Sequence, residues 1–506
     1  MSSANCHAIM AGAKIAASVA TPPVNTVAPA ITGTLGVGEV LTCSTGTWTG
    51  TATITYSRQW KSDGVNVGTD SANYTPVSGD AEHDITCVVT ATNGAGNANA
   101  TSNSVEIPPE DVLEDLLIDT TSRPPPSTDP RPAYLVPYTD PTFGTTITRI
   151  SGDPGSAMGS TGGIWGTNVH HQYNKHDVWN SDESMMFIET NGGGSGSAGL
   201  TFLHGQTYEV LYRRAAPAGW LEGKWDRGDP TRMIYCTATE IRTYNPVNGA
   251  TASLHNFAGT YSDMKFGQYA GEPSYDGDIY PVTATRTSDG DKVCFAYKVS
   301  TDAVLGVVSV TDLGKTMDEG HCAISPLGTY LECYFDDETI QIFNCVTGAH
   351  VTTFSGVGSP SHATMAIDGN GDEVLFGSNS SGGDKIKRRL SDGTSTLLTT
   401  NSFGYHASSI NYLDTGKWGI VDHFIDSGSP YVDELIVVAH NGSVVGRLCH
   451  LQLGDNMDYD GQPHSAAAPF SKRAVFASPW RGSGDPSRPV GVYVVDWSGF
   501  QLPGVG

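Results

Sequence analysis

Four segments in the second half of the chain begin with histidine and share one pattern of strand, turn and strand. Their first residues, His321, His362, His406 and His464, are separated by 41, 44 and 58 residues. In each segment a turn rich in Gly, Asp or Ser separates two apolar runs, and a further apolar run follows. A repeat of roughly 40–50 residues built from short strands is the size of one β-propeller blade. This repeat constrains the fold more than any other feature of the chain.

Three earlier segments fit the same pattern, and they begin at His171, Trp225 and Glu272. The sequence therefore predicts a seven-bladed β-propeller. We expect the strand at 145–152 to complete the last blade and close the ring. Six or eight blades remain open, because loop insertions blur the repeat, and a large sandwich or a β-helix is the alternative fold.

Composition supports an all-β fold and excludes some partners. Gly accounts for 60 of 506 residues and only 16% of residues are charged, which is typical of many short strands joined by turns. A net charge of −25 argues against nucleic acid as a partner, because phosphate binding needs a basic surface. We also expect no membrane insertion, because no apolar run is long enough to span a bilayer.

The first 23 residues, an N-terminal extension, make a poor secretory signal. They lack a basic start, and Lys14 interrupts their apolar stretch. Two explanations stay open: an export signal has been removed from this sequence, or the protein leaves the cell by another route, as a virion protein does when its host lyses.

Cys43 and Cys87 stand 44 residues apart with Trp60 between them, in runs that alternate apolar and polar residues. This order predicts an immunoglobulin-like β-sandwich over 24–108, with the two cysteines as a disulfide or as a reduced core pair. A proline-rich linker follows over 109–132, with a short helix expected at 112–117, and the propeller fills 133–506.

The segments ITGTLGVGEVLTCSTGTWTG, YSRQWKSDGVNV and ITCVVTATN resemble bacterial and phage immunoglobulin-like modules. That resemblance implies a spacer or a surface-display unit. The other seven cysteines form no Cys-x-x-Cys pair, and we expect them to be core thiols.

The histidines that begin the repeats are the candidate site. The innermost strand of a blade starts beside the central channel, so His171, His321, His362, His406 and His464 are expected to gather at one mouth. Such a cluster suits a general base or a divalent metal. The predicted catalytic residues are His171, Tyr173 and His406. The predicted ligands of one metal ion (Mn²⁺, Zn²⁺ or Ca²⁺) are His321, His362, His406, His464 and Gln462. Hydrogen bonds between blades are the structural alternative.

Four stretches of the propeller region resemble the propeller polysaccharide lyases, namely oligogalacturonate lyase and its ulvan-lyase relatives. They are HHQYNKHDVWNSDESMMF, WDRGDPTRMIY, MDEGHCAISPLGTYL and QPHSAAAPFSKRAVFASPW. The resemblance implies β-elimination on a uronic acid, with several His and one Gln on a metal. The spacing of those ligands is not matched residue by residue.

Two functions follow from these observations. The first is a surface-displayed protein that recognises an extracellular or cell-surface polysaccharide, such as a phage virion or tail-associated host-adhesion protein that contacts other virion proteins. The alternative is a polysaccharide lyase that uses the histidine cluster. Whether the chain is an enzyme stays open at this point. Both functions place it outside the cell or on a virion surface.

Overall fold

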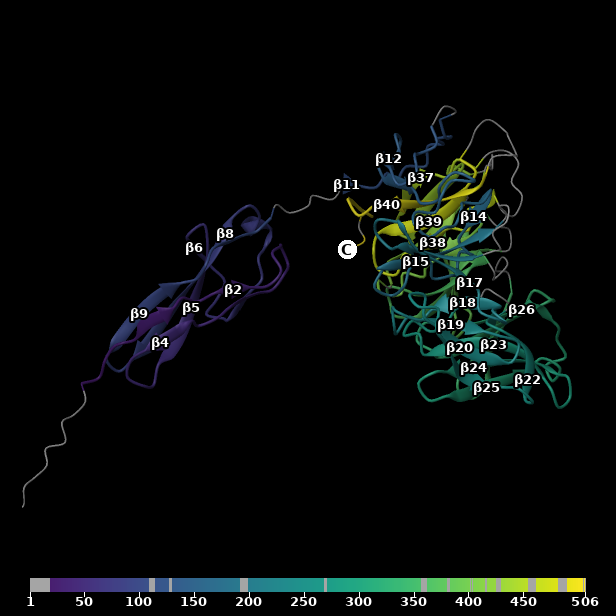
Figure 1. The fold of residues 1–506 in the computed structure, drawn as a ribbon, viewed down its shortest axis with the longest axis horizontal. Coiled ribbons are helices and arrows are strands. Elements are labelled where there is room, and N and C mark those ends of the chain that lie inside the picture. Colours follow the sequence, from purple (N-terminus) through teal and green to yellow (C-terminus); the bar gives the residue numbers. More distant parts are fainter. Residues whose placement is uncertain are drawn as a thin grey trace, which may run out of the picture. The chain divides into compact units, whose positions relative to one another are not determined.

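The computed structural model divides the chain into two units, 1–112 and 113–506, which are described separately below (Figure 1). Its secondary structure is almost entirely β. In the part of the chain that the structure describes, no helix is long and apolar enough to cross a membrane. The described residues are 19–108, 114–126, 130–191, 199–267, 271–355, 362–379, 383–400, 402, 404–414, 416–424, 429–453, 461–480, 489–503 and 505.

The first unit consists of three antiparallel sheets and one short 3-10 helix. The smallest sheet pairs β1 (Val24–Val27) with β4 (Thr47–Thr49). The second has the order β2 (Ile31–Thr32), β3 (Leu41–Cys43), β7 (Asn73–Tyr74). The third has the order β10 (Val105–Glu106), β8 (Asp84–Asn93), β5 (Thr55–Ser62), β6 (Val65–Val67), with β9 (Gly96–Thr101) also on β8. The helix is η1 (Ser78–Asp80).

The three residues singled out in the sequence of this unit lie in one core. Trp60 and Cys87 face each other across β5 and β8, and Cys43 is buried with them. The indole N–H of Trp60 donates to the Ser71 carbonyl at 2.9 Å, so the buried indole is satisfied. Both cysteines are free thiols in this structure. The immunoglobulin-like assignment of the unit stays a prediction.

The described residues of the second unit form seven antiparallel sheets, numbered here as blades 1 to 7. Blade 1 contains β14 (Asn168–His170), β15 (Met185–Asn191), β16 (Gly199–His204) and β17 (Val210–Ala215). Blade 2 contains β18 (Glu222–Trp225), β19 (Met233–Cys236), β20 (Glu240–Tyr244) and β21 (Thr251–Asn256). Blade 3 contains β22 (Tyr261–Lys265), β23 (Ile279–Arg286), β24 (Lys292–Lys298) and β25 (Ala303–Ser309).

Blades 4 to 6 repeat the same four-stranded meander, and blade 7 has five strands. Blade 4 contains β26 (Met317–Ile324), β27 (Tyr330–Phe335), β28 (Ile340–Asn344) and β29 (His350–Phe354). Blade 5 contains β30 (Thr364–Ile367), β31 (Glu373–Ser378), β32 (Lys385–Arg389) and β33 (Ser395–Thr399). Blade 6 contains β34 (Ala407–Ser408), β35 (Trp418–Asp422), β36 (Glu434–Ala439) and β37 (Val445–His450). Blade 7 has the order β38 (Ala466–Ala467), β39 (Arg473–Ser478), β40 (Gly491–Asp496), β13 (Thr146–Arg149), β12 (Pro137–Thr139).

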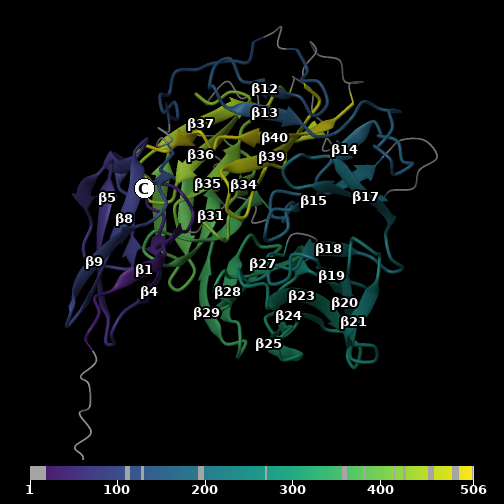
Figure 2. The same cartoon turned by 60° about the vertical axis from the view of Figure 1, so that its left-hand side comes forward.

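Blade 7 joins the two ends of the propeller sequence. β13 pairs antiparallel with β40, from Thr146 opposite Asp496 to Arg149 opposite Tyr493, and the strands lie side by side in Figure 2. The expectation that the strand at 145–152 completes the last blade is therefore confirmed. The pairing hides the free edge of β40, which would otherwise be open to another chain.

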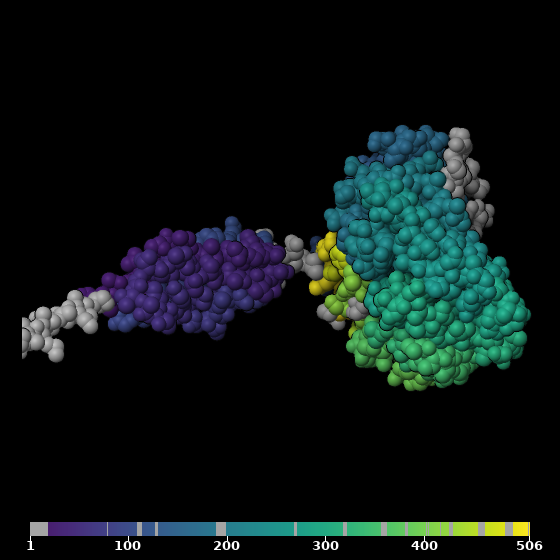
Figure 3. All heavy atoms as spheres, turned by 60° about the horizontal axis from the view of Figure 1, so that its bottom comes forward, coloured from purple at the N-terminus to yellow at the C-terminus, as the bar shows by residue number. Residues whose placement is uncertain are grey.

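Each blade buries its faces against its two neighbours. Apolar clusters lie at all seven junctions, and the teal and green atoms of the blades form one continuous body in the space-filling view (Figure 3). This cyclic packing is that of a β-propeller, as the repeat predicts. Pairs that represent the junctions in ring order are Phe202–Trp225, Ile234–Phe266, Cys294–Cys322, Ile342–Met365, Phe376–Val421, Trp418–Trp497 and Val492–Val169.

The cysteines other than Cys43 and Cys87 behave as expected where they are described. Each is a buried free thiol. Cys6 lies outside the described residues. The buried set is Cys236, Cys294, Cys322, Cys333, Cys345 and Cys449.

The segment that sequence reasoning treats as linker packs onto the propeller. β11 (Glu114–Asp115) is a strand that pairs parallel with β41 (Phe500–Gln501), so the short helix expected at 112–117 is wrong at those two residues. Leu116 lies in the core beside Leu502. The backbone N–H of Arg447 in β37 donates to the Leu117 carbonyl at 2.9 Å. We call residues 114–123 the strap.

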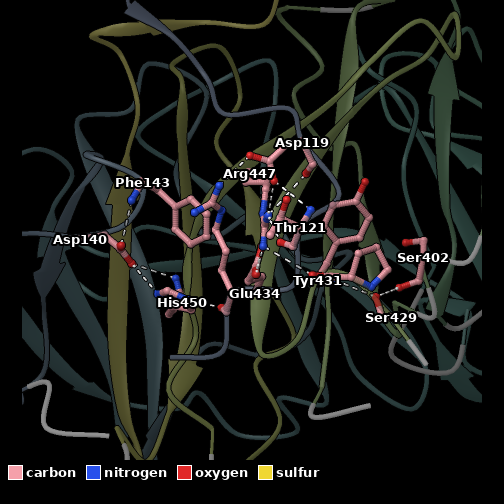
Figure 4. Close-up of polar contacts among 12 residues, drawn as sticks. Asp119, Thr121, Asp140, Phe143, Ser402, Ser429, Tyr431, Glu434, Arg447 and His450 are labelled. Atoms are coloured by element: carbon pink, nitrogen blue, oxygen red, sulfur yellow. Dashed lines mark hydrogen bonds and ion pairs between the residues drawn. The ribbon is translucent and has the colours of Figure 1, made fainter. Parts of the chain in front are cut away.

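Arg447 is the main polar anchor of the strap (Figure 4). Its fully buried guanidinium makes a bidentate ion pair with Glu434 and donates to the Thr121 carbonyl at 2.6 Å and to Asp119 at 3.1 Å. The ring of Phe143 stacks on it at 5.1 Å. This network pairs the buried charges of Arg447 and Glu434 and ties the strap to blade 6.

Candidate active site at the channel mouth

The segment 171–177, which follows β14, lies on the axis of the propeller. The Nδ2 of Asn174 donates to the Ala407 carbonyl of blade 6 at 2.6 Å. His176 Nε2 lies 3.0 Å from Glu222 of blade 2, and Lys175 Nζ lies 3.4 Å from His321 Nε2 of blade 4. A segment that contacts blades on different sides of a ring must lie near its centre. It therefore fills the channel and carries Tyr173 to the mouth.

Three of the predicted histidines surround Tyr173. The ring centroid of Tyr173 lies 6.3 Å from that of His362, 5.3 Å from that of His406 and 4.7 Å from that of His464. The His406 ring lies 5.0 Å from the His362 ring and 4.7 Å from the His464 ring. These three residues precede the innermost strands of blades 5, 6 and 7, so the repeat itself brings them together.

His406 is held by a carboxylate. Its Nδ1 lies 3.1 Å and 3.2 Å from the two oxygens of Asp422, and its backbone N–H donates to Asp422 at 2.9 Å. The second oxygen of Asp422 accepts the backbone N–H of Ser465 at 3.0 Å. One side chain on β35 thus fixes the residues that precede the inner strands of blades 6 and 7.

The charge of Asp422 determines the tautomer of His406. Burial opposes ionisation, but the hydrogen bonds from His406 and from the backbone of Ser465 help to outweigh it, and the pKa of Asp422 is lowered to about 2. An ionised carboxylate accepts the proton on Nδ1, which leaves the lone pair on Nε2. The Nε2 atom is buried and has no hydrogen-bond partner among the described residues. This is the arrangement of an oriented general base.

The neighbouring imidazoles are neutral at physiological pH. Burial lowers the pKa of His362 to about 3 and that of His464 to about 2. His464 also has a φ of 45°, in the left-handed region that residues other than glycine seldom adopt. Strain of this kind is found where a fold fixes a functional side chain.

The other predicted residues have contacts of their own. His321 Nε2 lies 3.4 Å from Lys175 Nζ and 3.6 Å from a carboxylate oxygen of Glu332. The Nε2–H of the fully buried His171 donates to the His464 carbonyl at 2.6 Å, which is a clamp between blades 1 and 7. Gln462 is half-buried, two residues before His464. The catalytic role of His171 and the metal-ligand roles of His321 and Gln462 stay predictions.

No group of three or more His, Cys, Asp or Glu side chains is arranged to hold a metal ion in the described ranges. Metal binding by the predicted ligand set therefore stays a prediction.

The channel is filled further along the inner strands. Arg227 makes two hydrogen bonds of 2.9 Å with Asp177, and its guanidinium stacks on Tyr412 at 4.4 Å. The Tyr275 hydroxyl lies 3.2 Å from the Met365 carbonyl of blade 5 and 3.1 Å from the Ser409 carbonyl of blade 6. Met365 and Ser409 follow His362 and His406 by three residues, so this network lies deeper than the histidines. A ligand at the cluster would have to enter from the histidine side.

Sequence reasoning missed Asp422, Tyr405 and Phe424. For Asp422 a signal existed, because the second strand of each repeat pairs with the first and Val421 lies opposite Ala407. An acid beside Val421 was therefore bound to lie near His406. Tyr405 directly precedes His406, and Phe424 lies two residues after Asp422. The repeat marks neither position.

Comparison with known proteins gives distant likenesses only. No family model and no curated protein matches the chain. Among solved structures, an oligogalacturonate lyase from Vibrio parahaemolyticus aligns with 11% identity and a TM-score of 0.46, over 71% of this chain and 96% of that one. The β-propeller domain of Cps50 (Swd1) from Myceliophteria thermophila aligns with 11% identity and a TM-score of 0.38, over 64% and 96%. The Pan2 WD40 domain of Neurospora crassa aligns with 9% identity and a TM-score of 0.38, over 64% and 88%. At these scores the likenesses carry no argument, and the description of the fold rests on the cyclic packing described above.

Proposed function

We propose that the propeller binds a polysaccharide at the mouth of its channel. The observation that carries this proposal is the convergence of Tyr173, His362, His406 and His464 on one point at the axis. Neutral imidazoles and a phenol offer both donors and acceptors to hydroxyl groups, and their rings offer apolar faces. Sugars present the same mixture of hydroxyl groups and C–H surfaces.

A specific observation favours a second candidate, β-elimination on a uronic acid. His406 Nε2 is a buried acceptor oriented by Asp422, and the Tyr173 ring lies 5.3 Å from the His406 ring. In this reaction His406 takes the C5 proton, the C4–O bond breaks as the C4–C5 double bond forms, and Tyr173 donates a proton to the leaving oxygen. The substrate carboxylate must be neutralised by a cation, and we assign no residue to that role.

The wider role of the chain is part of the proposal. A unit resembling immunoglobulin-like display modules, placed before a glycan-binding propeller, suits a phage virion or tail protein that attaches to a host surface polysaccharide. The support is the sequence resemblance of 24–108 together with the site at the propeller axis. Assembly of the full chain with purified virion or tail proteins would test this role separately.

One panel tests both candidates. The full chain is titrated calorimetrically with polygalacturonate, alginate, hyaluronan and neutral dextran, and the ultraviolet absorbance of a new C4–C5 double bond is followed in parallel. Binding without absorbance supports recognition alone. Absorbance that falls by about 100-fold or more in His406→Ala supports elimination, since a general base contributes at least that much. The matched control is His350→Ala, an exposed histidine on the outer strand of blade 4. A chain that binds none of the four would contradict the proposal.

A further inference from the structure

Tyr405 is the exposed member of the aromatic group at the channel mouth. Its side chain is 42% exposed, whereas the neighbouring His406 is buried. Its ring stacks on that of Phe424, with centroids 4.8 Å apart and planes inclined by 29°. The same ring lies 4.3 Å from the His362 ring and 4.8 Å from the His406 ring. One aromatic ring is therefore presented to solvent beside the candidate site.

The backbone on both sides of this ring is fixed. The Tyr405 N–H donates to the Asp422 carbonyl at 2.8 Å, and the buried Lys385 Nζ donates to the Gly404 carbonyl at 2.6 Å. A Cβ on Gly404 would lie 2.2 Å from a Val421 methyl and 2.9 Å from the His423 ring, so only glycine permits this close approach. An exposed side chain held in this way loses little freedom when a ligand binds.

We propose that Tyr405 is the platform on which one pyranose ring of the glycan stacks. The inference rests on the proposed function and specifies how the sugar is recognised. One face of a pyranose carries several C–H groups that pack on an aromatic plane, while its hydroxyl groups point outward in the plane of the ring. Tyr405 offers such a plane, Phe424 stacks on it, and the imidazole of His362 lies with its centroid 4.3 Å from that of Tyr405, where it can hydrogen-bond to the sugar.

The platform also fixes where the next sugar lies. The rings of His362 and His406 each lie close to both tyrosines, at 4.3 Å and 4.8 Å from Tyr405 and at 6.3 Å and 5.3 Å from Tyr173. A sugar seated on Tyr405 therefore places its neighbour in the chain over Tyr173 and His406. Tyr405 would bind the sugar next to the one that lies at His406 Nε2. It would take no part in proton transfer itself.

Four variants of the full chain test this assignment. Tyr405→Ala removes the plane, Tyr405→Leu replaces it with an apolar group of no plane, and Tyr405→Phe keeps it. Tyr56→Ala is the matched control, because Tyr56 is 38% exposed and lies in the other unit. Affinity is measured by calorimetry with whichever of polygalacturonate, alginate, hyaluronan and dextran the wild type binds, and folding is checked by thermal melting.

We expect Tyr405→Ala and Tyr405→Leu to bind about tenfold more weakly or worse, as truncation of a buried aromatic contact does. Tyr405→Phe should stay within about threefold of the wild type, and Tyr56→Ala should be unchanged. If Tyr405→Ala lowers the melting temperature, the folded Tyr405→Leu variant decides the matter. Wild-type affinity in both would overturn the platform and leave the proposed function standing. A wild type that binds none of the four would overturn both.

Discussion

Asp422 accepts hydrogen bonds from both the ring and the backbone of His406, and both side chains are fully buried. Burying a carboxylate is costly unless it is paired and hydrogen-bonded. Here the pairing also selects one tautomer of the imidazole, and it leaves Nε2 as the acceptor atom. The Asp422–His406 pair therefore sets the chemistry of the imidazole as well as holding the two strands together.

Replacing Asp422 by Asn should destabilise the tautomer and the junction between blades 6 and 7. The amide of Asn keeps one acceptor oxygen but places an NH₂ group opposite the N–H of either His406 or Ser465. One buried hydrogen bond is therefore lost. We expect a loss of about 1–3 kcal/mol in the free energy of unfolding. Urea titration measures this loss, and ¹⁵N spectra report the proton on Nδ1 of His406. A variant with wild-type stability and the same tautomer would show that the carboxylate does not orient the ring.

Acid should destabilise the propeller well before its carboxylates protonate. The pKa of His362 is about 3 and that of His464 about 2 in the folded state, both below their ordinary value of about 6.5. Below about pH 6.5 these histidines bind protons in the unfolded chain but not in the folded chain. The free energy of unfolding therefore decreases as pH falls below about 6.5. At pH 5 the loss is about 2 kcal/mol for each histidine.

Thermal melts from pH 7.5 to pH 5 of the wild type and of His362→Gln measure this effect. The variant should show a shallower fall in melting temperature, while His350→Gln, which changes an exposed histidine, should follow the wild type. Parallel curves for the wild type and His362→Gln would mean that His362 is not held neutral by burial.

The strap should depend on Arg447. Arg447→Ala leaves Glu434 buried without its cation, which costs about 3–5 kcal/mol. Limited proteolysis should then cut within 114–126, where the wild type resists. The double variant Arg447→Met with Glu434→Leu removes both charges and should recover most of the stability. If the single variant resists proteolysis as the wild type does, apolar contacts such as Leu116 with Leu502 hold the strap alone.

Removing 491–506 should unfold the propeller completely, because β40 lies in the middle of blade 7 between β39 and β13. Loss of this central strand separates the β12–β13 pair from β39 and opens the ring. Removal of 503–506 is the control, since it spares β41. Size-exclusion chromatography and circular dichroism distinguish the two. A folded monomer lacking 491–506 would contradict the ring closure.

The first unit should fold without the propeller. Its core around Trp60, Cys43 and Cys87 lies within 24–108. A fragment of those residues should melt cooperatively, with Trp60 fluorescence reporting the transition. Since both thiols are already free and buried, reduction should not abolish folding. A fragment that is unfolded at room temperature, oxidised or reduced, would refute the boundaries.

The sequence predicted the parts of the site that the repeat controls. His362, His406 and His464 come together because each precedes an inner strand of its blade. His321 occupies the same repeat position but lies beside Lys175, a residue of the segment 171–177 that crosses the channel after β14. The period of the repeat gives no information about such a segment.

The strap was beyond sequence reasoning for a related reason. Asp119 and Arg447 are 328 residues apart, and no periodicity links them. The acidic stretch also has local features of a helix, but pairing with β41 and burial of Leu116 favour an extended strand. Tertiary contacts of this kind override local propensity.

The central claim is that a sugar binds where the residues preceding the inner strands meet. The most direct test is a crystal structure of the full chain soaked with an oligosaccharide from the polysaccharide that it binds. We predict one sugar ring stacked on Tyr405 beside His362, and the neighbouring sugar unit over Tyr173 and His406. Density for the oligosaccharide on the first unit, or on the outer strands of the blades, with none at the channel mouth, would contradict the account.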